Sequence, residues 1–195
     1  ELLRIIYDNQ SEEGWYLEYE GADPGYQTLC TYYLFCTYEI TKDKELLSSL
    51  RKSAKFLSHF IHPDGTIGGL YGSRNTEVFY PAGIIGLSNE IEEFAMLSKY
   101  LEPQEQHILP QNIDTGNYIP FLNSYAVAAL HYDKNSEVIN LSKQKPFYFN
   151  EQEKYFKDTG IFLYSNNNYF VIINFKKGGT LKVFDKISNT IDTDD

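Results

Sequence analysis

A long glycine-bearing segment, residues 62–81, constrains the fold of this chain more than any other stretch. It separates two segments with helical periodicity, and its glycines stand at positions 65, 68, 69 and 72. Connections between helices usually take about 2–8 residues, and longer ordered ones usually carry function. Aromatic and aliphatic side chains alternate with polar groups along it, which favours an ordered loop over disorder. We therefore expect a functional loop; the alternative is a surface loop whose glycines only permit tight turns.

Of the two helices expected before the glycine-bearing loop, the first is predicted at residues 24–40. Asp23 and Pro24 mark its start, because Asp at the N-cap followed by Pro in the first turn is a strong helix-start signal. Nearly every side of this segment is apolar or aromatic, which is typical of a helix buried all round. Residues 43–61 combine apolar and charged side chains with a helical period, so this second helix is expected to expose one face to solvent.

The connection between these two helices is short, at residues 41–43. A short connection makes two helices antiparallel neighbours. The loops at 11–23 and 62–80 are therefore expected to emerge at the same end of the pair. Residues 81–101 continue with the period of a third helix. Glycine positions in the two loops repeat after about 50 residues, a period typical of stacked helical hairpins.

Beyond Pro146 the sequence changes from helical to strand-like patterning. β-Branched and aromatic residues dominate 160–164, 169–175 and 180–184, with polar or glycine-bearing turns between them. This pattern predicts a three-stranded antiparallel meander. Three strands hold together only when they pack on another element, so the strands are expected to lie against the helices or to be part of a sandwich.

The change of patterning predicts two domains. Residues 1–145 are expected to form an incomplete helical domain of α-hairpin repeats, and residues 146–195 an antiparallel β segment that begins a sandwich. The expected fold class is therefore mainly α with a C-terminal β part. A chain of 195 residues is long enough for such an arrangement, since a domain usually takes about 100–200 residues.

Charge and hydropathy exclude two classes of partner. The net charge is −10, and the sequence has no run of Lys or Arg, so the basic surface that nucleic acid requires is missing. We expect no nucleic-acid partner. No apolar run approaches the roughly 18 residues that a transmembrane helix needs, so a membrane partner is not expected either. A single basic cleft on an acidic protein would escape such a whole-chain count.

The two cysteines bear on the compartment. Cys30 and Cys36 lie six residues apart in one predicted helix, where successive side chains turn by about 100° and the two thiols point to different faces. They are expected to stay free, which favours a reducing compartment such as the cytoplasm. A periplasmic or secreted location stays open if a signal peptide has been removed.

Both loops and the β segment together resemble a known family. The sequences are Gly-Trp-Tyr-Leu-Glu-Tyr at 14–19, Asp-Gly-Thr-Ile-Gly-Gly-Leu-Tyr-Gly-Ser-Arg-Asn-Thr at 64–76, Thr-Gly-Ile-Phe-Leu-Tyr at 159–164 and Lys-Lys-Gly-Gly at 176–179. Their organisation resembles that of heparinase II/III-like polysaccharide lyases over residues 11–186. The resemblance implies an (α/α) toroid leading into a β-sandwich. Because a complete toroid needs more helices, we expect the chain to be a C-terminal portion of a larger protein.

The resemblance also implies β-elimination on uronic acid-containing glycans, with a Tyr or His base and polar groups that neutralise the substrate carboxylate. Residues of suitable type are Tyr71 or Tyr26 as base, Asn75 as neutraliser and Arg74 as bidentate carboxylate partner. A phenol ionises near about pH 10 unless a cation lies close, and Arg74 is the candidate cation. In the alternative interpretation Tyr71 packs beneath the loop, and Arg74 pairs with Glu77 or Glu20.

Two other functions stay open. A glycoside hydrolase needs two carboxylates flanking the bond, and Glu18 or Glu20 with Glu77 is the pair to test. A non-catalytic glycan-binding or scaffold protein would use the same aromatic loops without chemistry.

All three functions involve a polysaccharide or oligosaccharide. The substrate-binding candidates are Trp15, Tyr16, Glu18, Tyr19 and Tyr26. The rings of Trp15, Tyr16 and Tyr19 would stack on sugars or instead fill the mouth of the helical domain. No metal or other cofactor is expected. A second copy of the chain, or a missing N-terminal portion of the same protein, stays open as a further partner.

Overall fold

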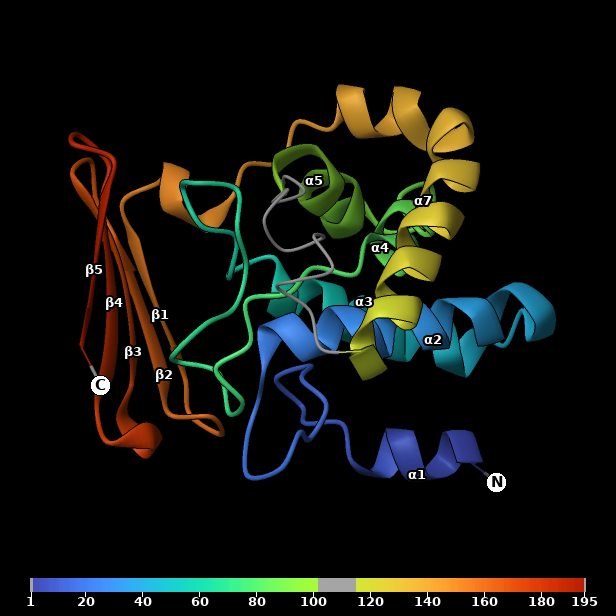
Figure 1. The fold of residues 1–195 in the computed structure, drawn as a ribbon, viewed down its shortest axis with the longest axis horizontal. Helices are drawn as coiled ribbons and strands as arrows, with labels where there is room; N and C mark the ends of the chain where they lie inside the picture. The colour runs from blue at the N-terminus through green and yellow to red at the C-terminus, as the bar shows by residue number, and fades with distance from the viewer. Residues whose placement is uncertain (1, 102–114, 195) are drawn as a thin grey trace.

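The computed structural model of the protein describes residues 2–101 and 115–194. A helical layer and a β-sheet lie side by side, and the two long loops run between them (Figure 1). The chain starts at the helical side and ends on the sheet. The coarse expectation of helices followed by an antiparallel sheet is confirmed.

Three helices precede the glycine-bearing loop, and the last two of them are close to the predicted ranges 24–40 and 43–61. The three are α1 (Leu2–Asp8), α2 (Pro24–Thr41) and α3 (Lys44–Leu57). Asp23 caps α2, since its carboxylate accepts the Tyr26 amide at 3.0 Å. Asp43 caps α3 through the amides of Glu45 and Leu46. These two caps fix where the helices begin and therefore where the loops meet them.

The single helix predicted at 81–101 is wrong, because the chain breaks there into α4 (Pro81–Gly86) and α5 (Glu92–Tyr100). Close packing explains the short α4: a Cβ on Gly86 would lie 2.3 Å from the ring of Phe35 on α2. Glycine lets the two helices approach, and the extended backbone of Ile91 then restarts the chain as α5. The last helix is α7 (Thr115–Leu141), which packs mainly on α4.

The predicted toroid of repeated hairpins is also wrong. Stacked hairpins require each long helix pair to be followed by another of similar size. Here α2 and α3 have 18 and 14 residues, whereas α4 and α5 have 6 and 9. Within residues 2–101 and 115–194, no second long hairpin repeats the α2–α3 pair. The two similar loops therefore do not mark a repeating architecture.

The sheet has five antiparallel strands that follow one another in sequence order. They are β1 (Gln152–Phe156), β2 (Ile161–Ser165), β3 (Tyr169–Asn174), β4 (Thr180–Asp185) and β5 (Thr190–Asp194), with short 3₁₀ turns η1 (Phe147–Phe149) and η2 (Phe175–Lys177). The three central strands match the predicted meander. The patterning misses β1 and β5, because neither strand has apolar alternation: the three middle residues of β1 and all residues of β5 are exposed.

Aromatic side chains join the sheet to the helices. Phe156 on β1 lies 5.0 Å from Phe56 and 5.6 Å from Phe60, measured between ring centroids. His62 lies 4.7 Å from Phe184 on β4. One face of the sheet is therefore buried against α3 and the glycine-bearing loop. Such contacts provide the packing that an isolated meander lacks.

Both cysteines are free, as expected. Burial raises the pKa of the Cys30 thiol to about 12, so this thiol is protonated at neutral pH. In the part of the chain that the structure describes, no helix has the length and apolar character needed to cross a membrane.

Candidate functional site

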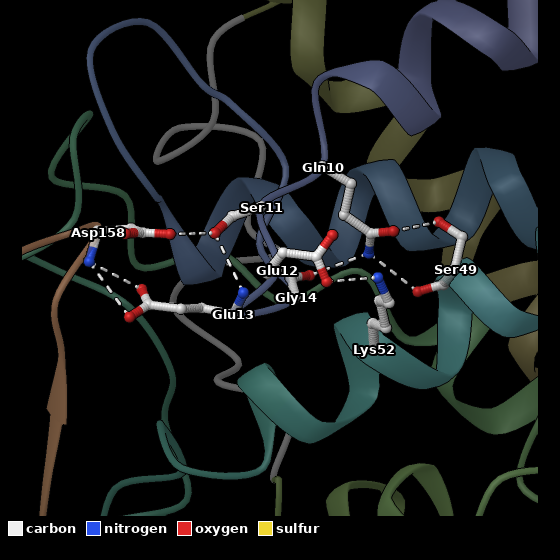
Figure 2. Close-up of polar contacts among 8 residues, drawn as sticks. All are labelled: Gln10, Ser11, Glu12, Glu13, Gly14, Ser49, Lys52 and Asp158. Carbon is white, nitrogen blue, oxygen red and sulfur yellow. Dashed lines mark hydrogen bonds and ion pairs between the residues drawn. The ribbon is translucent and has the colours of Figure 1, made fainter.

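The loop at 11–23 is anchored at its start, on both the helical layer and the sheet, before it reaches the candidate site. Gln10 donates to the Ser49 carbonyl on α3 at 2.9 Å, and Ser11 donates to Asp158 between β1 and β2 at 2.9 Å (Figure 2). The loop thus bridges the helical layer and the sheet. These contacts hold the residues that follow in a defined place.

The loop then forms a tight hairpin whose tip holds Tyr19 and Glu20. The Glu18 amide donates to the Gly21 carbonyl at 2.9 Å, and the Gly21 amide donates back at 3.2 Å. Tyr19 has a φ of 55°, in the left-handed region that non-glycine residues rarely adopt. Its side chain is 72 % exposed. A strained, exposed aromatic residue at a loop tip is a feature often associated with function.

The glycine-bearing loop meets this hairpin directly. The Ser73 amide donates to the Ala22 carbonyl at 2.9 Å, and the Arg74 amide donates to the Asp23 carboxylate at 2.8 Å. Asp23 therefore joins the start of α2 to the second loop. Burial raises the pKa of its carboxyl group, and hydrogen bonds from the Tyr26 and Arg74 amides oppose that rise. The expectation that both loops meet is confirmed.

Arg74 is held between two tyrosine rings. Its guanidinium carbon lies 4.6 Å from the ring centroid of Tyr19 and 4.6 Å from that of Tyr26. Its Nη1 atom donates to Glu18 at 3.3 Å. A guanidinium has five N–H donors, and Glu18 is the only acceptor that the side chain reaches among the described residues. Cation–π stacking thus orients the group while most of its donors stay available.

A pocket of about 480 Å³ lies beside this arginine. Three parts of the chain line it: Tyr19, Glu20, Gly21 and Ala22 from the hairpin, Ser73 and Arg74 from the second loop, and Thr159, Asn174, Lys176 and Lys177 from the sheet. The lining contains three cationic side chains and one carboxylate. It is therefore basic, although the whole chain has a net charge of −10.

The two lysines in the pocket have different surroundings. Lys177 Nζ donates to the Leu70 carbonyl at 2.9 Å, to the Gly72 carbonyl at 2.6 Å and to the Asn75 side chain. Lys176 Nζ donates to the Asp158 carbonyl at 2.8 Å. The predicted neutraliser Asn75 is thus bound to a lysine of the sheet. Its backbone φ of 57° is left-handed, like that of Tyr19.

Tyr71, one of the two predicted bases, lies outside the pocket lining and is fully buried. Its hydroxyl accepts the Gly68 amide at 3.0 Å and lies 2.8 Å from His62 Nε2. Thr66 donates to Asp64 and therefore accepts from Nδ1–H of His62, so Nε2 accepts the Tyr71 hydroxyl proton.

Burial raises the pKa of Tyr71 well above its usual value and lowers the pKa of His62 well below its own. Both groups are therefore neutral near pH 7. The chain of hydrogen bonds between them pins the loop, as in the alternative interpretation in which Tyr71 packs beneath it. The ion pair of that interpretation is wrong, because Arg74 pairs with Glu18 and not with Glu77 or Glu20.

The other predicted residues lie away from the pocket. Glu77 forms an ion pair with Lys182, whose side chain is only 4 % exposed. Trp15 is partly buried against the core, and Tyr16 is buried with its hydroxyl 2.7 Å from Ser49. Glu77 therefore does not face Glu18 or Glu20 across the pocket, as a carboxylate pair for hydrolysis would require.

The structure thus brings together part of the predicted set. Tyr19, Glu20 and Arg74 line the pocket, and Glu18 and Tyr26 contact Arg74. The sequence did not predict that Thr159, Asn174, Lys176 and Lys177 line one side of the pocket. The Lys-Lys-Gly-Gly turn at 176–179 could have indicated a basic site, since two adjacent lysines are unusual in so acidic a chain. Their meeting with the glycine-bearing loop depends on how the sheet packs.

Among residues 2–101 and 115–194, no group of three His, Cys, Asp or Glu side chains is placed to hold a metal ion. Comparison of the sequence with family models and with curated proteins finds no match.

Proposed function

We propose that the protein binds acidic glycans, with the pocket beside Arg74 receiving the carboxylate of a uronic acid. The observation that carries this proposal is the guanidinium held between Tyr19 and Tyr26, with most of its N–H donors available. A planar, oriented guanidinium pairs with a carboxylate through two parallel hydrogen bonds.

The electrostatics of the pocket favour an acidic ligand over a neutral one. Arg74, Lys176 and Lys177 outnumber Glu20 in the lining, so the pocket attracts anions within a protein that otherwise repels them. The exposed ring of Tyr19 offers an amphipathic surface for the apolar face of a sugar. Charge and aromatic contact together fit a uronic acid better than a neutral hexose.

Binding without cleavage is the function that the geometry supports best. Elimination needs a base within hydrogen-bond reach of the substrate, and neither predicted base lines the pocket. Tyr71 is buried with a raised pKa, and the ring of Tyr26 packs on the guanidinium of Arg74. Hydrolysis needs two carboxylates across the bond, and Glu77 is paired with Lys182 instead.

Calorimetric titration with a uronic-acid tetrasaccharide and with a neutral tetrasaccharide tests this proposal. Wild-type protein is expected to bind the acidic sugar, more weakly as salt rises. Arg74→Ala should weaken binding at least about tenfold, which corresponds to about 1.4 kcal/mol. Arg51→Ala, which removes the same charge from the exposed face of α3, serves as the matched control.

Two results would overturn the proposal. One is equal affinity for the neutral and acidic sugars, and the other is equal weakening by the Arg74 and Arg51 substitutions. Ultraviolet absorbance of the same mixtures detects any unsaturated product. Its growth would show that the site cleaves by elimination.

A further inference from the structure

Lys177 is one of the contacts between the sheet and the loop that carries Arg74, together with Asn174, whose side-chain amide donates to the Tyr71 carbonyl at 2.7 Å, and Lys182, which pairs with Glu77. Lys177 lies at the end of η2, directly after β3. Its ammonium group donates to Leu70, Gly72 and Asn75. Three donors on one ammonium meet three acceptors on one loop, so the hydrogen-bonding capacity of Lys177 is filled by the protein itself.

The three acceptors surround the turn that delivers Arg74. The Asn75 amide also donates to the Gly72 carbonyl at 3.2 Å, and Asn75 has a left-handed backbone. Such a conformation costs free energy unless neighbouring contacts support it. Lys177 supplies one of those contacts by binding the Asn75 side chain and the Gly72 carbonyl together.

Arg74 is thus held from two sides. On the helical side its amide donates to Asp23, and its guanidinium stacks on Tyr19 and Tyr26. On the sheet side Lys177 fixes the residues before and after it. Lys176 lines the same pocket, but its hydrogen bond goes to Asp158, outside this turn.

We infer that Lys177 is a positioning residue, which holds the Arg74 turn in the form that binds a carboxylate and does not itself bind the ligand. This inference rests on the proposed function. Lys176, whose ammonium group donates only to the Asp158 carbonyl among the described residues, is then the lysine of the pocket that has donors left for a ligand. The sheet therefore completes the site by fixing an arginine that belongs to a loop of the helical part.

Lys177→Met and Lys176→Met test this inference, because both remove one charge from the pocket lining. The first readout needs no ligand: the NMR signal of the Arg74 Nε–H group, assigned by its loss in Arg74→Lys. The rings of Tyr19 and Tyr26, each with its centroid 4.6 Å from the guanidinium carbon, shift this signal in the wild type. Lys177→Met should move the signal towards the position of an unstacked arginine, and Lys176→Met should leave it in place.

The second readout is affinity for the uronic-acid tetrasaccharide. Lys177→Met is expected to weaken binding at least about tenfold, and Lys176→Met only about twofold to threefold, the effect of one exposed charge. An unchanged Arg74 signal in Lys177→Met, or equal losses of affinity in the two variants, would overturn the inference. A shifted signal in a protein whose wild type binds no acidic glycan would support the positioning role and refute the proposed function instead.

Discussion

Tyr71 and Arg74 stand three residues apart in one loop, yet they meet opposite environments. Arg74 lines an open pocket between two rings, whereas Tyr71 is enclosed with His62 and Phe60. Both residue types suit elimination chemistry, so the sequence alone cannot tell which of the two side chains lines the pocket and which is buried. The separation depends on which side chain the sheet covers, and that is a property of the folded molecule.

Replacing Tyr71 with Phe tests its assignment as a buried support. The change leaves the Gly68 amide and His62 Nε2 without their partner. A buried polar group that loses its partner costs about 1–3 kcal/mol, so the free energy of unfolding measured with denaturant should fall by that amount. Affinity for the acidic tetrasaccharide should stay within about twofold of the wild type. Unchanged stability with lost binding would contradict this assignment.

The buried side chain of His62 makes the free energy of unfolding depend on pH. Burial lowers its folded-state pKa well below the unfolded value of about 6.5. The unfolded chain therefore binds more protons at low pH, so the stabilising contribution is complete above about pH 6.5 and is lost as the pH falls below it. His59 acts in the same direction, also through burial. Each histidine contributes up to about 1.4 kcal/mol per pH unit to the slope.

Denaturant unfolding of His62→Gln between neutral and mildly acidic pH measures this contribution. The variant is expected to be less stable at neutral pH, because Gln cannot reproduce both ring hydrogen bonds. Its stability should nevertheless fall less steeply than that of the wild type as the pH decreases. Equal slopes in the two proteins would show that His62 is not the group responsible.

At the scale of single elements, the N-cap residues of α2 and α3 allow a direct comparison of two caps with different surroundings. Asp43 caps α3 alone, whereas Asp23 caps α2 and also accepts the Arg74 amide. Asp43→Ala should cost about 1 kcal/mol, the usual value for a cap. Asp23→Ala should cost about 2–4 kcal/mol, because the half-buried Arg74 amide also loses its acceptor. Thermal and denaturant unfolding measure both, and equal costs would contradict the bridging role of Asp23.

Local signals explain which elements could be predicted. Asp23 with Pro24 marks the start of α2, and the β-branched runs mark β2 to β4, because these signals act within a few residues. The break between α4 and α5 depends on Gly86 meeting a ring of another helix. β5 pairs through its backbone while its polar side chains face water. Neither feature leaves a periodic pattern in the sequence.

The residues of the candidate site divide in the same way, into those that local sequence signals indicate and those that only the packing of the fold brings together. Tyr19, Glu20 and Arg74 could be proposed because a short interhelical connection brings the two loops together. The contribution of Lys177 arises from contacts between residues more than a hundred positions apart. Such contacts follow from how the sheet packs on α3, which local patterning does not determine.

For the whole molecule, the aromatic contacts between the sheet and α3 predict cooperative unfolding. Phe156 is buried against Phe56 and Phe60, so Phe156→Ala should cost about 3–5 kcal/mol. Because the sheet and the helices share this packing, circular dichroism and the fluorescence of Trp15 should report one shifted transition. Tyr155→Ala, on the opposite face of the same strand, should cost less than about 1 kcal/mol. Two separate transitions would contradict the shared core.

The central claim is that three segments of an acidic chain assemble one basic, arginine-centred pocket for an acidic sugar. The most direct test is the affinity of the uronic-acid tetrasaccharide for the wild type, Arg74→Ala and Tyr71→Phe, measured by calorimetry at low and high salt. The account predicts salt-sensitive binding that Arg74→Ala weakens at least about tenfold and Tyr71→Phe leaves nearly unchanged. Binding that depends on Tyr71 and survives the loss of Arg74 would contradict it.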